Sequence, residues 1–461
     1  MKIKFGTDGF RGYIGKDFTF DNALKVAKLA LTYFKKDRNN HVAVGYDTRF
    51  LSKEVAVEIA KTSKQFGFKT LLSDSFVPSP AISLFIHKKK LSFGIMVTAS
   101  HNPPQFNGVK IKENYGGSAI TGTMEGISKV VLKEQHDNKE GVLKTEDIRD
   151  FYLSYLKNCF NLSSYKDGLK ILVNPMFGAS QGCMSELLKD TKFEVKEINS
   201  VINPSFGGIN PEPTEENLAE TKKIMGSLKY DVGFAFDGDG DRISAFDDKG
   251  SFYSSQRLLP LFLHYLVTVK KETGVVVKTV STSSMLRKVA ESHGLKVEEV
   301  PIGFKNIVPF FLSKKALIGG EESGGIAIKG YIPERDGVYC ALTLLEILAH
   351  YKKPLSKIWK EMEQLYGTYV FKREDYHFED ENTVRKILDK LDFDDICRFK
   401  VTSKNFIDGR KFLFGDDNFL LIRVSGTEPV VRVYCECNSK SELEDVFDWA
   451  KRMLRKSGVS C

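Results

Sequence analysis

A serine at position 100 follows residues that favour a β-strand and precedes residues that favour a turn. The apolar stretch Leu91 to Ser100 predicts the strand. Asn102-Pro103-Pro104 predicts a turn, because Asn-Pro and Pro-Pro pairs lead the chain out of a sheet. The turn would present the Ser100 hydroxyl to a cleft, where it could act as a nucleophile. An ordinary Ser-His turn is the alternative, and no Gly-x-Ser-x-Gly sequence indicates a hydrolase triad.

Three carboxylates stand close together in a second motif. Asp237, Asp239 and Asp241 alternate with glycines, which permit a tight loop, so that the carboxylates can converge on one divalent cation. An EF-hand is excluded, because its sixth position is Arg242 rather than glycine and its twelfth is Asp248 rather than glutamate. We expect a magnesium site of oxygen ligands that leaves a position for substrate or phosphate; a polar turn is the alternative.

A third motif is the glycine-rich segment 319–325, which contains Glu321 and Ser323. Its side chains offer acceptors and a hydroxyl, which suit sugar hydroxyls better than phosphate. A Walker A loop is excluded, because the Gly-Lys-Ser/Thr end is missing. A solvated glycine-rich turn is the alternative.

A fourth motif has the composition of a phosphate clamp. Arg423, Ser425 and Thr427 supply a guanidinium and two hydroxyls around the loop amides near Gly426. The alternative is a β-turn between two strands with Arg423 directed to solvent.

These motifs need strands and helices to position them. Three apolar runs each end at a polar loop, over 91–100, 230–242 and 316–325, and helical periodicity fills the gaps, for example over 23–30 and 55–60. Alternating strands and helices predict parallel α/β layers, in which ligands bind beyond the carboxyl ends of the strands. From about residue 369 the pattern changes to a separate α+β module. It contains helical patterns over 382–391 and 441–454 and strands over 419–423 and 430–434.

Length and composition set outer limits. A chain of 461 residues is expected to form about three domains, and its net charge of +8 suits a small anionic substrate but is too dispersed to indicate nucleic acid. The apolar run between Arg257 and Lys270 is too short to cross a membrane and predicts a buried helix. The N-terminus predicts no signal peptide, and seven scattered cysteines without a CxxC pair predict neither a zinc site nor a disulfide framework. We therefore expect a cytoplasmic chain.

Taken together, the motifs resemble the α-D-phosphohexomutase family, of the bacterial phosphoglucomutase/phosphomannomutase type. The matching segments run in the family's order along the whole chain: 5–12 with Gly-Thr-Asp-Gly, 98–103, 237–242, 320–324 and 423–429. Any one of them is weakly specific, but four loops in order are strongly so.

The resemblance implies a four-domain α/β protein arranged around a central cleft. Three related α/β domains with mixed sheets are expected, followed by a smaller C-terminal α+β domain that closes the cleft. The implied divisions are 1–148 for the phosphoserine domain, 149–250 for the metal-binding domain, 251–367 for the sugar-binding domain and 368–461 for the C-terminal phosphate-binding domain.

The resemblance also implies a reaction. Phosphorylated Ser100 would give its phosphoryl group to a hexose 1-phosphate of glucose or mannose, and a bound 1,6-bisphosphate would return its other phosphate to Ser100. A hexose 1,6-bisphosphate would also serve as activator. Phosphoserine carries about −1.5 to −2 charge at neutral pH, and three aspartates add to it, so Mg²⁺ bridging Ser100 with Asp237, Asp239 and Asp241 would relieve the repulsion.

Roles for other residues follow from the same resemblance. Lys110 and His101 are candidates for proton transfer, although a structural cap is the preferred interpretation of His101. Arg11, Arg242 and Lys110 would offset negative charge. Substrate contacts are expected from Glu321 and Ser323 to the sugar 3- and 4-hydroxyls, from Arg423, Ser425, Gly426 and Thr427 to the non-reacting phosphate, and from Lys305 and Arg335.

Departures from the family pattern leave alternatives open. Some members have histidine where this chain has Gly325, so proton transfer from that position is in doubt. A phosphoglucosamine mutase is an alternative, although Glu322 before Ser323 argues mildly against it, because glutamine is typical there. A non-catalytic sugar-phosphate binding relative and a metal-dependent phosphohydrolase are further alternatives. We expect a phosphosugar as ligand, no nucleic acid or membrane partner, and a monomer or homodimer.

Overall fold

The structure is a computed structural model that describes residues 3, 5–6, 9–35, 39–132, 141–161, 165, 168–378, 381–425, 430–456 and 459. The chain folds into two compact units. Unit 1 comprises residues 1–255, 308–314 and 323–357, and unit 2 comprises residues 256–307, 315–322 and 358–461.

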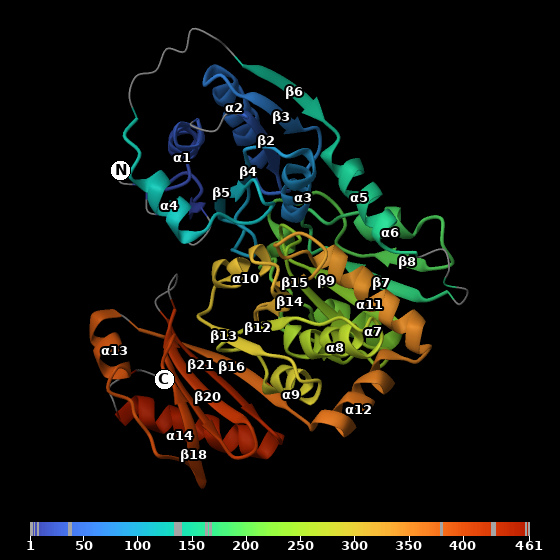
Figure 1. The fold of residues 1–461 in the computed structure, drawn as a ribbon, viewed down its shortest axis with the longest axis vertical. Helices are drawn as coiled ribbons and strands as arrows, with labels where there is room; N and C mark the ends of the chain where they lie inside the picture. The colour runs from blue at the N-terminus through green and yellow to red at the C-terminus, as the bar shows by residue number, and fades with distance from the viewer. Residues whose placement is uncertain are drawn as a thin grey trace. The chain divides into compact units, whose positions relative to one another are not determined.

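Unit 1 begins with a mixed six-stranded sheet (Figure 1), in the order β1-β5-β4-β2-β3-β6. Neighbours among β4, β2, β3 and β6 are parallel, whereas β5 runs antiparallel to both β4 and β1. The strands are β1 (Gly9–Tyr13), β2 (His41–Tyr46), β3 (Lys69–Ser73), β4 (Phe93–Val97), β5 (Phe106–Glu113) and β6 (Val142–Glu146). The associated helices are α1 (Phe20–Phe34), α2 (Ser52–Gln65), α3 (Ser79–Lys89), α4 (Thr121–Ser128) and α5 (Ile148–Cys159).

The two-residue period of the strands separates the helices onto two faces of this sheet. Val42, Val44 and Tyr46 of β2 belong to the core that α1 and α2 complete. On the opposite face a Cβ at Gly45 would lie 2.4 Å from Ile82 of α3, so the glycine lets this helix pack closely. Helix α1 begins at a capping residue, because the Thr19 hydroxyl accepts a hydrogen bond from the Asn22 amide.

A second mixed sheet of unit 1 has the order β11-β10-β9-β7-β8. Strands β8, β7 and β9 are parallel, β10 runs antiparallel to β9, and β11 runs antiparallel to β10. The strands are β7 (Lys170–Asn174), β8 (Glu194–Glu197), β9 (Val232–Phe236), β10 (Ile243–Phe246) and β11 (Phe252–Tyr253). The other elements of unit 1 are α6 (Cys183–Leu188), a 3-10 turn (Phe206–Gly208), α7 (Ala219–Ser227), α10 (Val308–Leu312), β15 (Ile326–Ile328) and α11 (Gly337–Tyr351).

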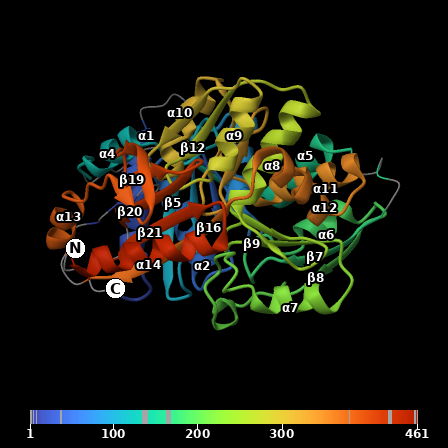
Figure 2. The same ribbon diagram turned by 90° about the horizontal axis from the view of Figure 1, so that it is seen from below.

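Unit 2 contains parallel strands in the order β13-β12-β14 and a separate antiparallel sheet in the order β16-β21-β20-β19-β18-β17. Helix α14 runs along one face of the antiparallel sheet (Figure 2). The strands are β12 (Val275–Thr279), β13 (Val297–Val300), β14 (Ala316–Gly320), β16 (Val370–His377), β17 (Asp395–Ile396), β18 (Phe399–Asn405), β19 (Arg410–Phe414), β20 (Asn418–Val424) and β21 (Val430–Cys437). The helices are α9 (Ser284–Ser292), a 3-10 turn (Phe304–Asn306), α13 (Glu381–Leu388) and α14 (Lys440–Lys456), with α8 (Ser255–Thr268) and α12 (Leu355–Tyr366) at the divisions between the units.

The fold confirms the predicted α/β class with mixed sheets and a C-terminal α+β part. The three apolar runs form β4, β9 and β14, and the expected helices over 23–30 and 55–60 form α1 and α2. The run between Arg257 and Lys270 forms α8 with Pro260 inside it. Among the described residues, none of the helices has the length and apolar character needed to cross a membrane. Six of the seven cysteines lie in the described part of the chain, and all six are free thiols.

Candidate active site

Ser100 stands at the sharp turn that follows β4. Its backbone has a φ of 54°, a left-handed conformation that non-glycine residues rarely adopt. The Ser100 amide donates to the Thr98 hydroxyl at 2.9 Å, and that hydroxyl donates to Asp47 Oδ2 at 2.6 Å. These buried contacts compensate for the strained backbone and fix the direction of the serine side chain.

A buried arginine holds the rest of this loop. Arg49 lies just after β2, its side chain is inaccessible to solvent, and its Nε lies 3.3 Å from Asp47 Oδ2. Its two terminal nitrogens donate to four backbone carbonyl oxygens, those of Ser100 (2.6 Å), Asn102 (2.6 Å), Phe106 (2.9 Å) and Pro103 (3.0 Å). The sequence analysis missed Arg49 and Asp47. The sequence feature that could have indicated them is the triplet Asp47-Thr48-Arg49, which follows the carboxyl end of a parallel strand, where polar ligand-binding groups are common.

The aspartate loop connects β9 to β10, whose antiparallel pairing places Phe236 opposite Ile243. Gly240 takes a φ of 73°, which glycine adopts without strain. A Cβ at Gly238 would lie 2.4 Å from the carbonyl oxygen of Ser100, so this glycine allows the two loops to touch through their backbones. The tight loop thereby brings its carboxylates to the serine.

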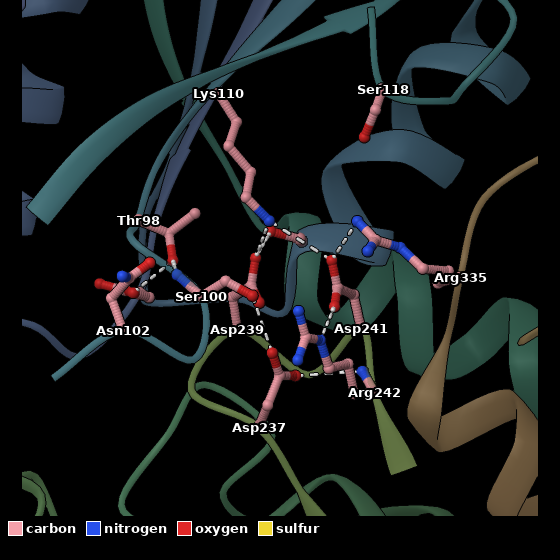
Figure 3. Close-up of polar contacts among 12 residues, drawn as sticks. Thr98, Ser100, Asn102, Lys110, Ser118, Asp237, Asp239, Asp241, Arg242 and Arg335 are labelled. Atoms are coloured by element: carbon pink, nitrogen blue, oxygen red, sulfur yellow. Dashed lines mark hydrogen bonds and ion pairs between the residues drawn. The ribbon is translucent and has the colours of Figure 1, made fainter. Parts of the chain in front are cut away.

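The three aspartates form a compact, fully buried group. One carboxylate oxygen from each of Asp237, Asp239 and Asp241 lies within 4.8 Å of the others. The Ser100 hydroxyl donates to Asp237 Oδ2 at 2.8 Å (Figure 3). Within the described ranges, Oδ1 of Asp239 and Oδ1 of Asp241 are buried without a hydrogen-bond partner. Unpaired buried oxygens and a set of only oxygen donors fit a hard divalent cation such as Mg²⁺.

Basic side chains surround the aspartates (Figure 3). Lys110 Nζ, on β5, lies 2.8 Å from Asp239 Oδ2 and 3.3 Å from Asp241 Oδ2. Arg335 reaches the same Asp241 oxygen at 2.8 Å. The Arg242 amide donates to Asp237 Oδ1 at 3.0 Å, and its guanidinium pairs with Glu212 at 2.9 Å. The group is thus held between positive charges on several sides.

Burial and mutual repulsion dominate the protonation of this group. Burial, with the neighbouring charges of Asp241 and Asp239, raises the pKa of Asp237 well above its usual value. Burial acts in the same direction on Asp239, but the charge and hydrogen bond of Lys110 outweigh it and lower the pKa of Asp239. A carboxyl group whose charged form is disfavoured in this way is one whose negative charge a cation would stabilise.

His101 and Arg11 also lie at the serine loop. Burial, followed by the charges of Arg242, Arg11 and Lys110, lowers the pKa of His101 well below its usual value, so its ring is neutral. Its Nδ1 is buried, and no described residue gives it a hydrogen bond. Arg11, on β1, donates to Asn102 Oδ1 at 2.7 Å. Thr7 and Asp8 of the N-terminal segment 5–12 lie outside the described residues.

Arg335 owes its position to a second buried ion pair, which the sequence analysis missed. Glu334 contacts Lys112 Nζ at 2.6 Å, and both side chains are inaccessible to solvent. Burial opposes ionisation of Glu334, but the charges of Lys112 and Arg335 lower its pKa to about 2. A Cβ at Gly325 would lie 2.2 Å from Arg335 Cδ. Gly325 therefore leaves room for this arginine.

The remaining predicted residues divide between the units. Ser323 belongs to unit 1, beside Gly324, whose carbonyl oxygen accepts from the Ile243 amide at 3.1 Å. Unit 2 contains Glu321, Lys305, Arg423 and Ser425. The structure therefore assembles the serine, the aspartates, Lys110, Arg242 and Arg335 in one place, and the sugar and phosphate motifs only in part.

Within unit 2, Glu321 Oε1 accepts a hydrogen bond from the Gly303 amide at 3.0 Å, two residues before Lys305. Arg423 contacts Asp408 at 3.2 Å. The Ser425 amide donates to the Val430 carbonyl oxygen at 2.9 Å, next to the pairing of Val424 with Val431. Gly426 and Thr427 lie outside the described residues.

Comparison with known proteins gives a consistent set of matches along the chain. Four domain models match, described as phosphoglucomutase/phosphomannomutase alpha/beta/alpha domains I, II and III and the phosphoglucomutase/phosphomannomutase C-terminal domain. They match residues 2–138, 150–250, 254–366 and 356–452 respectively.

Individual relatives match over nearly their full length. A phosphoglucomutase/phosphomannomutase of Thermococcus kodakarensis is 29% identical, with 98% of both chains covered. A probable phosphoglucosamine mutase of Methanosphaera stadtmanae is 31% identical, with 96% of both covered. The crystal structure of a putative phosphomannomutase from Thermus thermophilus is similar with a TM-score of 0.88 and 31% identity, over 99% of both chains.

Proposed function

This chain belongs to the phosphoglucomutase/phosphomannomutase family, the α-D-phosphohexomutases, and on that premise we propose that it interconverts hexose 1-phosphate and hexose 6-phosphate through a phosphoserine at position 100. The observation that carries the proposal is the Ser100 hydroxyl, which donates to Asp237 at 2.8 Å beside two buried carboxylate oxygens that accept no hydrogen bond from the described residues. A nucleophile against a cation-binding carboxylate group is the arrangement that phosphoryl transfer needs.

The reaction consists of two phosphoryl transfers. In the first, the bond between phosphorus and Ser100 Oγ breaks as a bond forms between phosphorus and the 6-hydroxyl oxygen of a hexose 1-phosphate. The proton of the sugar hydroxyl ends on Ser100 Oγ, and a hexose 1,6-bisphosphate results. In the second, the bond between phosphorus and the oxygen at position 1 breaks as a bond forms between that phosphorus and Ser100 Oγ. The serine proton ends on the sugar oxygen, and hexose 6-phosphate leaves. Charge balance is unchanged, and no further reactant is needed.

The proposed metal ligands are Ser100, Asp237, Asp239 and Asp241. When bound, Mg²⁺ would neutralise charge at the phosphoryl group and polarise it for in-line attack. Lys110 offsets the carboxylates from the other side, because its Nζ lies 2.8 Å from Asp239 Oδ2, and we propose it as the proton carrier. Arg11, Arg242 and Arg335 supply positive charge to the same reacting groups. Neutral His101 is kept as the less favoured candidate for proton transfer.

Recognition of the sugar and of its non-reacting phosphate is assigned to other residues. Glu321 and Ser323 are proposed to bind the 3- and 4-hydroxyls, with Lys305 as a further substrate contact. Arg423, Ser425, Gly426 and Thr427 are proposed to clamp the phosphate that does not react. A clamp that recognises only phosphate accepts the bisphosphate in either orientation, because both ends carry one.

The preferred sugar is proposed as glucose or mannose, with glucosamine as the alternative. Relatives of comparable identity have names of both kinds, phosphoglucomutase/phosphomannomutase and phosphoglucosamine mutase. Along with the reaction we propose the divisions 1–148, 149–250, 251–367 and 368–461, a hexose 1,6-bisphosphate as activator, a cytoplasmic location, and a monomer or homodimer.

The test is a coupled assay on one preparation with glucose 1-phosphate, mannose 1-phosphate and glucosamine 1-phosphate, in the presence of Mg²⁺ and a trace of glucose 1,6-bisphosphate. Ser100→Ala should lower turnover at least about a thousandfold, because it removes the phosphoryl carrier. Ser128→Ala, at an exposed position on α4, is the matched control and should keep wild-type turnover. Near-normal turnover by Ser100→Ala would refute the assignment. Release of inorganic phosphate in place of isomerised sugar phosphate would indicate a phosphohydrolase, and no turnover of any sugar would indicate a non-catalytic relative.

A further inference from the structure

Charged residues form a row across the antiparallel sheet of unit 2. Register pairing places Asp375 of β16 opposite Arg432 of β21, and Arg432 opposite Arg423 of β20. Two arginines directly opposite on neighbouring strands repel each other unless opposite charge lies beside them. Carboxylates flank the pair on both sides, since Arg432 Nε lies 3.2 Å from Asp375 Oδ2 and Arg423 Nε lies 3.2 Å from Asp408 Oδ1.

Asp408 makes a second contact with its other oxygen. The Ile302 amide donates to Asp408 Oδ2 at 2.8 Å, and the next amide, that of Gly303, donates to Glu321 Oε1 at 3.0 Å. A continuous series of polar contacts therefore runs from Arg423 through Asp408 and two successive backbone amides to Glu321. All of these residues belong to unit 2.

The local backbone explains how Asp408 reaches both partners. Gly409 follows it with a φ of 92°, and a Cβ there would lie 2.5 Å from Arg423 Cβ. Only glycine allows the turn before β19 to pass this close to β20. The Asp408 side chain is 21% exposed and that of Arg423 is 11% exposed, so their contact is largely shielded from water.

A parallel series starts from the other end of the row. Arg373 contacts both oxygens of Asp375, at 2.9 and 3.1 Å, and its Nη1 donates to Glu322 Oε1 at 3.1 Å. Each of the two adjacent glutamates is thus connected to one of the two aspartates that flank the arginine pair. The second series reaches Glu322 and not Glu321, and Asp408 makes none of its contacts.

We infer that Asp408 is a positioning residue that sets the distance and direction between the phosphate-clamping Arg423 and the sugar-binding Glu321. The inference rests on the proposed function, which assigns those two roles. One Asp408 oxygen contacts Arg423 Nε and so orients the guanidinium group. The other Asp408 oxygen accepts from the Ile302 amide and so holds the backbone segment whose next amide, that of Gly303, orients Glu321. A ligand that carries a phosphate and vicinal hydroxyls on one rigid ring gains from both at once, whereas inorganic phosphate gains from Arg423 alone.

The test compares Asp408→Ala and Asp408→Asn with the wild type. Both variants lose hydrogen bonds that involve charged groups. KM should therefore rise about tenfold to a hundredfold, with a much smaller change in kcat. The substrate is the hexose 1-phosphate that the wild type turns over. Calorimetry with the same sugar phosphate should show a matching loss of affinity. Affinity for inorganic phosphate should fall less. Asp416→Asn is the matched control, because its carboxylate is 84% exposed and contacts only Lys288 among the pairs found in the described residues.

A double-mutant cycle separates coupling from a general structural effect. Asp408→Ala and Glu321→Gln should be non-additive, since the first variant already disturbs the position of the second residue. Asp408→Ala with Glu322→Gln should be close to additive. If the losses of affinity in Asp408→Ala and Glu321→Gln simply multiply in the double variant, so that their free energies add, the inference is overturned. An unchanged KM in Asp408→Asn would also overturn it. Either result leaves the proposed function intact. A wild type without mutase activity would overturn the proposed function itself. Circular dichroism checks that each variant folds. If Asp408→Ala does not fold, Asp408→Asn, which keeps the side-chain shape, provides the test.

Discussion

At the scale of single residues, the chemistry depends on how Ser100 is held. Its φ of 54° is unfavourable for an L-residue, and the turn persists because Arg49 binds the carbonyl oxygens of the loop while Asp47 receives the Thr98 hydroxyl. Contacts on every nitrogen of one planar guanidinium give a rigid frame that an ammonium group cannot reproduce. We therefore regard Arg49 as the residue that keeps the Ser100 hydroxyl directed toward Asp237.

Arg49→Lys tests this role. One Nζ cannot satisfy four carbonyl oxygens, so buried acceptors lose their partners and Asp47 loses part of its counter-charge. We expect a loss of roughly 3 kcal/mol in the free energy of unfolding and a fall in the rate of Ser100 phosphorylation by glucose 1,6-bisphosphate of at least about tenfold. Urea unfolding and phosphopeptide mass spectrometry measure the two effects.

Arg398→Lys provides the matched control, because the Arg398 side chain is 64% exposed and its ion pairs lie at the surface. Wild-type stability and wild-type phosphorylation in Arg49→Lys would contradict the role given to Arg49.

At the scale of elements, α11 begins at a buried cap next to the aspartate site. Asp336 accepts from the Tyr339 amide at 2.9 Å and from the hydroxyls of Tyr152 and Tyr331. Burial raises the pKa of Asp336 from 3.8 to about 6, and the hydrogen bonds offset this only in part. The two residues before it are Glu334 and Arg335, so the helix start also positions the arginine that reaches Asp241.

The raised pKa predicts a pH dependence of stability with a definite sign. Between pH 3.8 and about 6 the folded state binds more protons at Asp336 than the unfolded chain does, so this residue lowers the free energy of unfolding as pH rises. The full contribution is about 3 kcal/mol, present below pH 3.8 and lost above pH 6. Asp336→Asn removes it, so the stability of the variant relative to the wild type should increase by up to about 3 kcal/mol from about pH 4 to about pH 7.

Urea unfolding of both proteins over this pH range measures the difference. Asp147→Asn, at the exposed cap of α5, is the control for loss of a capping carboxylate. A stability difference between Asp336→Asn and the wild type that stays constant over this range would show that Asp336 is ionised equally in the folded and unfolded states.

Sequence reasoning was effective where a motif is local and ineffective where contacts are remote. The glycines between Asp237 and Asp241 and the prolines after Asn102 indicated loops at strand ends, and the structure has those loops there. The family resemblance placed Lys110 near the reacting groups. Sequence spacing could not give the contacts of Lys110 and Arg335 with Asp241, because both lie far from it along the chain and only the fold brings them together. Arg49 was missed for the same reason, since its partners are backbone carbonyl oxygens that no side-chain pattern marks.

At the scale of the whole molecule, the fold divides the proposed roles between two compact units. Unit 1 contains the proposed phosphoryl carrier, the carboxylates and Lys110, whereas unit 2 contains Glu321, Arg423 and the row of charges that connects them. The division falls within the glycine-rich sugar motif, between Glu322 and Ser323. The proposed chemistry and much of the proposed recognition therefore belong to different units. The predicted domain limits differ from this two-unit division and stay predictions.

The central claim is that Ser100 carries a phosphoryl group between the two ends of a sugar. The most direct measurement starts with protein carrying a radioactive phosphate at Ser100, confirmed by phosphopeptide mapping, and adds unlabelled glucose 1-phosphate with Mg²⁺. The account predicts that the label leaves the protein and appears in glucose 1,6-bisphosphate and glucose 6-phosphate, and that removal of Mg²⁺ by EDTA prevents this. Label that stays on Ser100 with every hexose 1-phosphate tested, or that is released as inorganic phosphate, would contradict it.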